Sequence, residues 1–226
     1  MTQAIEPVRK IMNYNDRALL LGMLIGDGCL KVKPHKDTKY YEYVISHSTK
    51  QKEYLEHKLK IFHSIVGGKK PNISYGKTKW GESCRFSRCN KYFKLLHRYL
   101  YSNNNKKYIT RKVLDWLNEQ SLAIWYMDDG GLKLSYNNQK QVSSCQMTLS
   151  TYCSEEQANI IINWFKEKWG IECRKLLHKK TNSFYLSFNT KEGKKLEELI
   201  KPYIISSMEY KLPSNRITRV LDTPSG

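Results

Sequence analysis

Two aspartates of the sequence stand in the same unusual context. Asp27 and Asp129 each follow an apolar segment, and each precedes a glycine, Gly28 or Gly130. A carboxylate at the C-terminal end of a helix opposes the helix dipole, which costs about 0.3–1 kcal/mol. Each Asp-Gly pair could also be a simple helix ending, because glycine is common just beyond the last turn. The occurrence of two such pairs favours a chemical role.

The two aspartates belong to an internal duplication. Residues 20–32 align without a gap on residues 122–134, at an offset of 102. Weaker similarities follow at offsets of 103 and 104, which indicates a tandem repeat of about 100 residues. Each half is predicted to have the order helix, strands, helix, strands, helix. Asp16 and Ser121 are the predicted caps of the two apolar helices.

Alternating β-forming residues separated by turn residues predict six strands. These cover residues 30–33, 40–46, 83–88, 132–135, 142–149 and 183–188. Amphipathic helices are expected around residues 54–66 and 158–169. The basic stretches 77–88 and 174–180 are expected to flank the sheets and add phosphate contacts.

Composition and charge limit the classes of function. The chain has 226 residues and a formal net charge of +18, which favours a polyanionic partner such as nucleic acid. Hydrophobic residues make up 40%, so the chain is a folded protein rather than a basic disordered tail. The longest small-and-apolar run, residues 18–26, is much shorter than the roughly 20 residues that cross a bilayer. The six cysteines form no CxxC pair, which favours reduced thiols in an intracellular, reducing compartment, and we expect no secretory signal.

Packing of the two apolar helices against each other would place the two Asp-Gly ends side by side. Gly22, Gly26 and Ala123 would allow the backbones to approach closely. Two carboxylates a few ångströms apart repel each other unless a cation lies between them. Oxygen ligands with open positions suit Mg²⁺, which completes its shell with phosphate oxygens and water. In so basic a chain, this arrangement predicts metal-assisted hydrolysis of a phosphodiester.

These segments resemble the two motifs of single-chain LAGLIDADG homing endonucleases of the intron-encoded type. The resemblance is carried by residues 20–28 and 122–130, and the terminal Asp-Gly is intact in both. The chain departs from the motif at Ile124, which replaces a glycine, and at Ile25 and Met127, which replace an acidic residue. Similarity continues at residues 105–109 and 208–213, so that it covers nearly the whole chain.

The resemblance implies an α+β fold made of two pseudosymmetric αββαββα repeats. The motif helices would form the central interface, and two antiparallel, saddle-shaped sheets would straddle DNA. The expected N-terminal repeat covers residues 1–103 and the C-terminal repeat covers residues 121–226. Residues 104–120 would form the linker and the start of the second repeat, with Lys107 serving the N-terminal half.

The resemblance also implies a set of site residues. Two carboxylates and two backbone carbonyls would bind Mg²⁺, for which Mn²⁺ can substitute, and two lysines would act near the reacting water. They are Asp27 and Asp129, the carbonyls of Gly26 and Asp128, and Lys107 and Lys211. The two lysines follow their aspartates by 80 and 82 residues, and this near-equal spacing supports assigning both. Ser48 and Thr151 are candidates for organising water at the turn between strand and helix.

Alternate strand residues are expected to face DNA, because successive side chains of a strand point to opposite faces. A β-ribbon fits the major groove, where such side chains can read base edges or contact phosphates. The candidates are Lys31, Lys33, His35, Arg85, Ser87, Lys133, Ser135, Ser144, Gln146 and Thr148. The expected partner is double-stranded DNA rather than a membrane, and the expected state is a monomer because one chain supplies both half-sites.

Two alternatives use the same scaffold. An RNA-binding maturase would use the basic surface to help its host intron fold, and a repressor would bind DNA without cutting it. Retention of both motif aspartates argues against a maturase that has lost cleavage. The sequence does not distinguish an organelle matrix from a bacterial or phage-infected cytoplasm.

Overall fold

The computed structural model describes residues 12–35, 38–79, 81–90, 92–101, 106–139 and 142–215. Two four-stranded antiparallel sheets dominate it, one from each repeat. The first has the order β1-β2-β4-β3, with β1 Cys29–His35, β2 Thr38–Ser48, β3 Ser74–Thr78 and β4 Gly81–Cys89. The second has the order β5-β6-β8-β7, with β5 Gly130–Tyr136, β6 Val142–Cys153, β7 Arg174–His178 and β8 Ser183–Phe188. The identical strand order confirms the duplication.

The helices occupy equivalent places in the two repeats. Those of the first are α1 Tyr14–Ile25, α2 Lys52–Val66 and α3 Phe93–Leu100, and those of the second are α5 Glu119–Asp129, α6 Glu155–Trp169 and α7 Thr190–Ile200. Helix α4 (Arg111–Asp115) joins the repeats, and three short 3₁₀ turns are η1 Thr49–Gln51, η2 Lys201–Tyr203 and η3 Ser206–Lys211. The predicted α+β fold of two αββαββα units is confirmed.

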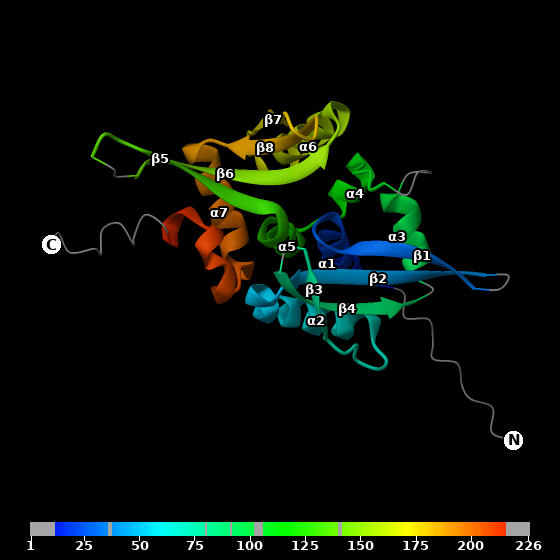
Figure 1. Cartoon of the computed structure of the whole chain (residues 1–226). Helices are drawn as coiled ribbons and strands as arrows, with labels where there is room; N and C mark the ends of the chain where they lie inside the picture. The colour runs from blue at the N-terminus through cyan, green and yellow to red at the C-terminus, as the bar shows by residue number, and fades with distance from the viewer. Residues whose placement is uncertain are drawn as a thin grey trace, which may run out of the picture.

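Helices α1 and α5 contact each other between the two sheets (Figure 1). Both are buried on nearly all sides, from Ala18 to Ile25 in α1 and from Ser121 to Met127 in α5. A helix with this pattern has no polar face, because one side packs on the partner helix and the other on the core of its own repeat. The expected close approach is confirmed at Gly22, where an added Cβ would lie 2.5 Å from the Ser121 carbonyl oxygen.

The remaining long helices cover one face of each sheet. Helix α2 packs on β2 and β4, while α6 packs on β7 and β8. Side chains therefore alternate along the strands: in β4, Cys84 and Phe86 are buried, whereas Arg85 and Ser87 are exposed. Within the part of the chain that the structure describes, the helices thus cover one face of each sheet and leave the other face to exposed side chains.

The predicted helix caps are wrong by three residues. The Asn13 side chain accepts a hydrogen bond from the Asp16 backbone N–H, and the Asn118 side chain accepts one from Ser121. Asn118 and Ser121 form a reciprocal capping box. The apolar pattern begins only after the first turn of each helix, so a prediction from this pattern places the first residue of the helix too late in the sequence.

All six predicted strands are present, most of them longer than predicted. The prediction missed β3 and β7, which are short edge strands with mostly exposed side chains and so carry little alternation. The stretches 77–88 and 174–180 do not flank the sheets as expected, because they contain part of β3, most of β4 and all of β7. The first two residues of the predicted linker, 104 and 105, lie outside the described residues, and the repeat boundaries stay a prediction.

Among the described residues, no helix is long and apolar enough to cross a membrane.

Candidate active site at the seam of the two motif helices

The two motif aspartates lie at one end of the α1–α5 pair, and we call the contact between the C-terminal ends of these two helices, residues 26–28 and 128–130, the seam. Asp129 is the last residue of α5, and Asp27 lies two residues beyond the end of α1. Between them Gly26 packs against the carboxylate of Asp128 so closely that a Cβ at Gly26 would overlap it. The glycine at this position is therefore a requirement of the seam.

The carboxylates at the seam influence one another. Burial raises the pKa of Asp129 to about 7, and the negative charges of Asp128 and Asp27 contribute to this rise. The pKa of Asp27 is raised by burial and by Asp128. Carboxylates whose ionisation is opposed in this way are typical of a site that receives a cation.

The two predicted lysines contact the ends of their motif helices. Lys107 Nζ donates a hydrogen bond to the Gly26 carbonyl at 2.6 Å. Lys211 Nζ donates to the Asp128 carbonyl at 3.0 Å and to the Met127 carbonyl at 2.6 Å. Burial lowers the pKa of both lysines, and the nearby carboxylates partly offset this effect.

Each lysine is influenced by carboxylates of both repeats. The strongest carboxylate influence on the pKa of Lys107 comes from Asp129, whereas Asp128 and then Asp27 dominate for Lys211. Lys107, Gly26 and Asp129 line a common groove of about 700 Å³. Lys107 and Asp129 therefore share one groove, although the sequence predicted that Lys107 serves the N-terminal half, and Lys211 contacts the end of α5.

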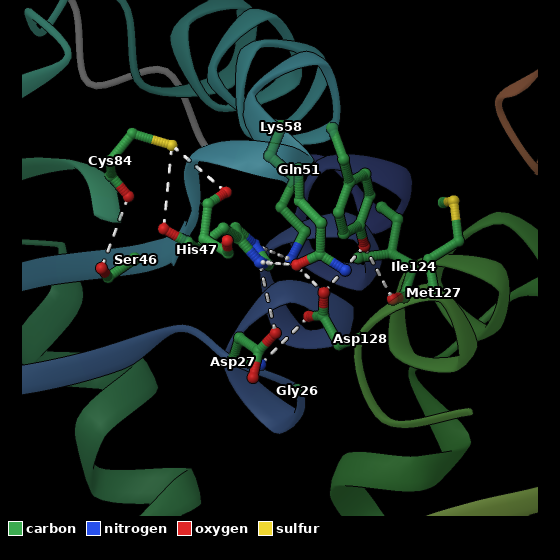
Figure 2. A network of polar contacts seen from close by, with 12 residues as sticks. Gly26, Asp27, Ser46, His47, Gln51, Lys58, Cys84, Ile124, Met127 and Asp128 are labelled. Atoms are coloured by element: carbon green, nitrogen blue, oxygen red, sulfur yellow. Dashed lines mark hydrogen bonds and ion pairs between the residues drawn. The ribbon is translucent and has the colours of Figure 1, made fainter. Parts of the chain in front are cut away.

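A polar network that the sequence did not predict surrounds the Asp128 side chain (Figure 2). Its Oδ1 accepts hydrogen bonds from the Tyr54 hydroxyl at 2.8 Å and from Lys58 Nζ. Its Oδ2 accepts the backbone N–H of Asp27 at 3.0 Å. The side chains of Lys58 and Asp128 are both completely buried. This ion pair joins α2 of one repeat to α5 of the other.

His47 extends the network toward Asp27. Its Nε2 lies 3.2 Å from Lys58 Nζ and its Nδ1 lies 3.2 Å from Gln51 Oε1. A lysine ammonium only donates, so Nε2 accepts and Nδ1 carries the proton. Burial and the charge of Lys58 lower the pKa of His47 to about 4, consistent with a neutral ring.

Asp27, His47 and Asp128 also bring one potential ligand atom each within 4.8 Å of one another. The Asp27 Oδ2 to His47 Nδ1 distance is 3.6 Å. However, both His47 nitrogens and both Asp128 oxygens already have partners. A cation held by all three residues would have to compete with those bonds and replace the proton on His47 Nδ1, which favours a structural role for His47 and for the Asp128 carboxylate.

The sequence contained one signal for this network. Lys58 lies in the apolar stripe of α2, between the buried residues Leu55 and Phe62. A completely buried lysine requires a partner, because lysine is almost never fully buried unpaired. The partner itself, 70 residues away in the other repeat, could not be read from the pattern.

The two weaker candidates for organising water differ in position. The Ser48 hydroxyl caps η1 by accepting the Lys50 backbone N–H at 3.4 Å. Thr151 lines the groove beside Asp129, where its hydroxyl donates to the Phe184 carbonyl at 2.9 Å. Of these two, Thr151 alone lies in the groove that contains a motif aspartate.

The predicted DNA-facing residues lie on the strand faces opposite the helices. The side chains of Lys31, Lys33, Arg85, Ser87, Lys133 and Ser135 are exposed, and those of Ser144, Gln146 and Thr148 are partly exposed. The side chain of His35 lies outside what the structure describes. Register places Lys133 opposite Gln146 and Gly131 opposite Thr148. Glu42 was not predicted on this face; it lies opposite Lys31 and forms an ion pair with Lys33 at 2.7 Å.

Known proteins share both the sequence and the fold. The chain is 30% identical over 200 residues to the probable intron-encoded endonuclease 1 of Wickerhamomyces canadensis, covering 87% of this chain and 83% of that protein. It is 26% identical over 221 residues to Protein RecA of Mycobacterium gastri, covering 95% of this chain, and it spans about half the length of that relative, 51%.

A solved structure of the homing endonuclease I-WcaI bound to its DNA recognition sequence matches with a TM-score of 0.71 and 27% identity, over 89% of this chain and 87% of that one. A crystal structure of I-DmoI in complex with DNA and Mn shares the fold, with a TM-score of 0.52 and 16% identity, over 85% of this chain and 99% of that one. The model of the LAGLIDADG DNA endonuclease family matches residues 17–196. The chain therefore belongs to the LAGLIDADG DNA endonuclease family and carries both motifs in one chain, as the resemblance implied.

Proposed function

We propose that this protein is a site-specific homing endonuclease that makes a double-strand break in DNA by divalent-metal-dependent phosphodiester hydrolysis. The observation that carries the proposal is the pair of motif aspartates, Asp27 and Asp129, at one seam between two sheets with exposed basic side chains. Their raised pKa values support a cation site, because the seam disfavours two ionised carboxylates without a counter-charge. The named endonuclease relatives support the same activity.

The donor set suits a hard divalent cation. Carboxylate oxygens of Asp27 and Asp129 and the carbonyl oxygens of Gly26 and Asp128 are the ligand types that Mg²⁺ prefers. I-DmoI was solved with DNA and Mn, and a variant of it was solved with its target DNA in the presence of Mg. We expect Mg²⁺ to serve here and Mn²⁺ to substitute. When bound, such a cation would activate water and stabilise the leaving oxygen of the phosphodiester.

The chain's own residues would position and neutralise the scissile phosphates. Lys107 and Lys211 are held against carbonyls of the motif ends, so their ammonium groups are fixed close to the aspartates. Their lowered pKa values make loss of a proton from Nζ to an adjacent water easier than for an ordinary lysine. Each half of the site therefore contains one carboxylate and one lysine, as cutting of two strands requires.

The sheets would hold the duplex over this seam. Their exposed basic side chains, such as Lys31 and Lys133, occupy equivalent positions in β1 and β5. Basic and amide side chains on a β-ribbon can contact phosphates and base edges of the major groove. Because one chain provides both sheets, we propose that the protein acts as a monomer. The RNA-binding maturase alternative is not favoured, because the matched family and the intron-encoded relative are endonucleases by name.

Selection from a random duplex pool, followed by a cleavage assay, tests the proposal. The bound target should be cut on both strands with Mg²⁺ and left intact with EDTA. Asp27→Asn and Asp129→Asn should each slow cutting by about 100-fold or more, while target binding in Ca²⁺ persists. Asp115→Asn, an exposed aspartate on α4, is the matched control and should cut normally. Undiminished cutting by both motif variants would contradict the proposal.

A further inference from the structure

The two motif aspartates are attached to the fold in different ways. Asp129 belongs to α5, and the next N–H, that of Gly130, donates to the Tyr126 carbonyl and closes the helix. Asp27 lies outside α1, whose final bonds come from the N–H groups of Gly26 and Gly28. The N–H of Asp27 itself reaches across the seam to Asp128 Oδ2 at 3.0 Å, as Figure 2 shows.

The carboxylate that accepts this N–H is itself rigidly held. Lys58 and Tyr54 donate to its other oxygen, and the Tyr54 hydroxyl also lies 3.1 Å from the Ile124 carbonyl. Lys58 is fixed in turn by His47 and lies over the Tyr54 ring, with Nζ 4.3 Å from the ring centroid. Hydrogen bonds to charged groups are strong where water is excluded, so the orientation of Asp128 is well defined.

The positions equivalent to Asp128, Tyr54 and Lys58 in the opposite repeat carry residues that cannot form the same hydrogen bonds. At an offset of 102, Gly26 stands where α5 has Asp128, so no side chain reaches from that position toward Asp129. At an offset of 103, Gln157 and Ile161 stand where α2 has Tyr54 and Lys58. Gln157 instead accepts the backbone N–H of Ile109. The seam also has no room for a second side chain, because a Cβ at Gly26 would overlap Asp128.

We propose that Asp128 is a positioning residue that fixes the Asp27 backbone across the seam, which makes the two halves of the site unequal. The half around Asp27 depends on the buried Lys58–Asp128 pair, whereas the half around Asp129 depends on its own helix. This inference rests on the proposed nuclease function only for its consequence in cutting. The hydrogen bond from the Asp27 N–H to Asp128 can be measured whether or not the protein cuts DNA.

Two double variants separate the effect of losing the acceptor oxygen from the effect of losing the buried charges. A single change at either residue would leave a buried unpaired charge and risk unfolding. Lys58→Met with Asp128→Ala removes both charges and the acceptor. Lys58→Met with Asp128→Asn removes both charges but keeps an amide oxygen for the Asp27 N–H, and the Asn amine can donate to the Tyr54 hydroxyl. Lys195→Met with Glu192→Gln removes both charges of the Lys195–Glu192 pair on α7 and is the control for loss of an ion pair.

Amide hydrogen exchange tests the attachment directly. In the Ala double variant the Asp27 amide should exchange about fivefold or more faster than in the Asn double variant, the equivalent of one hydrogen bond. The Gly28 amide, bonded to the Met23 carbonyl, is the internal reference and should be unchanged. Equal exchange of the Asp27 amide in the two double variants would overturn the proposal.

Cutting of a supercoiled plasmid that carries the selected target tests the consequence. The Ala double variant should accumulate nicked circles with the nick confined to one strand, whereas the Asn double variant and the double variant of the α7 pair should pass on to linear DNA. Equal slowing of both strands, or identical time courses for the Ala and Asn double variants, would overturn the inequality of the halves. If the wild-type protein cuts no target, the proposed function fails, and the exchange experiment alone still decides the role of Asp128.

Discussion

The negative charges of the carboxylates at the seam repel one another in the absence of a cation. Burial and mutual repulsion raise the pKa of Asp129 to about 7 and raise that of Asp27 as well. Natural sequences keep such unfavourable groups where function requires them, at a cost in stability. The electrostatics of single residues therefore lead to two predictions.

Asp129→Asn should stabilise the metal-free protein at high pH. The folded-state pKa of Asp129, about 7, lies above its ordinary value of 3.8, so the folded protein holds this proton more tightly than the unfolded chain. The contribution of Asp129 to stability therefore falls as pH rises from about 4 to about 7. In EDTA the Asn variant should have the higher Tm at pH 8, and the difference should vanish near pH 4. A wild-type Tm at pH 8 equal to or above that of the variant would contradict the assignment, and Asp115→Asn serves as control.

Lys107→Met and Lys211→Met should slow cutting without preventing DNA binding. Each removes a fixed ammonium group from a different half of the site, so we expect roughly 100-fold slower cutting of mainly one strand, and of opposite strands for the two variants. End-labelled strands on a denaturing gel measure this. Lys191→Met, an exposed lysine of α7, is the control. If each variant slowed both strands equally, the lysines would serve the site as a whole rather than one half each.

At the scale of elements, the contact between α1 and α5 sets the distance between the two aspartates. The helices approach closely at Gly22, beside the backbone of Ser121. The position of α5 that is equivalent to Gly22 is Ile124. A glycine in α1 alone is therefore enough for the two helices to approach closely. The departure from the motif in the second repeat is therefore compatible with the same interface.

Gly22→Ala should weaken this interface. The new Cβ would lie 2.5 Å from the Ser121 carbonyl oxygen, and backbone cannot move aside as a side chain can. We expect a loss of about 1–3 kcal/mol, measured by urea unfolding. Gly76→Ala in β3 is the matched control, since its nearest neighbour would be Ser83 Oγ at 4.0 Å. Equal stability of the two variants would show that the helices have room to separate.

At the scale of the whole molecule, the chain has a net charge of +18, and both sheets present exposed basic side chains. Lys31 in β1 and Lys133 in β5 are exposed on the faces opposite the helices. The two half-sites are therefore predicted to contribute similarly to DNA binding, even though their chemistry differs at the seam.

Lys31→Ala and Lys133→Ala should each weaken target binding and reduce its salt dependence. Each phosphate contact that is lost should lower the slope of log K against log salt by about 0.9. Fluorescence anisotropy at several salt concentrations measures the slope, and Lys191→Ala on α7 should leave it unchanged. An unchanged slope with altered sequence preference would instead assign that lysine to a base edge.

Much of the site was predictable because it is repeated. The duplicated Asp-Gly endings made Asp27 and Asp129 candidates, and the resemblance to a known family added Lys107 and Lys211; their roles stay a prediction. His47 and Tyr54 were missed, since their roles depend on partners in distant segments. Lys58 gave a visible signal, a lysine in an apolar stripe, but the pattern of one helix does not name the residue that neutralises it.

The sequence by itself determined the duplication, six of the strands that the structure describes and the pair of aspartates, because these follow from periodicity and self-similarity. Only the tertiary structure decided how the two halves differ. Repeated sequence implies equivalent positions, yet the seam is a single shared space in which Gly26 and Asp128 cannot both carry a side chain. The side chain present there extends into one repeat, so steric exclusion on the pseudosymmetry axis turns a twofold sequence into an asymmetric site.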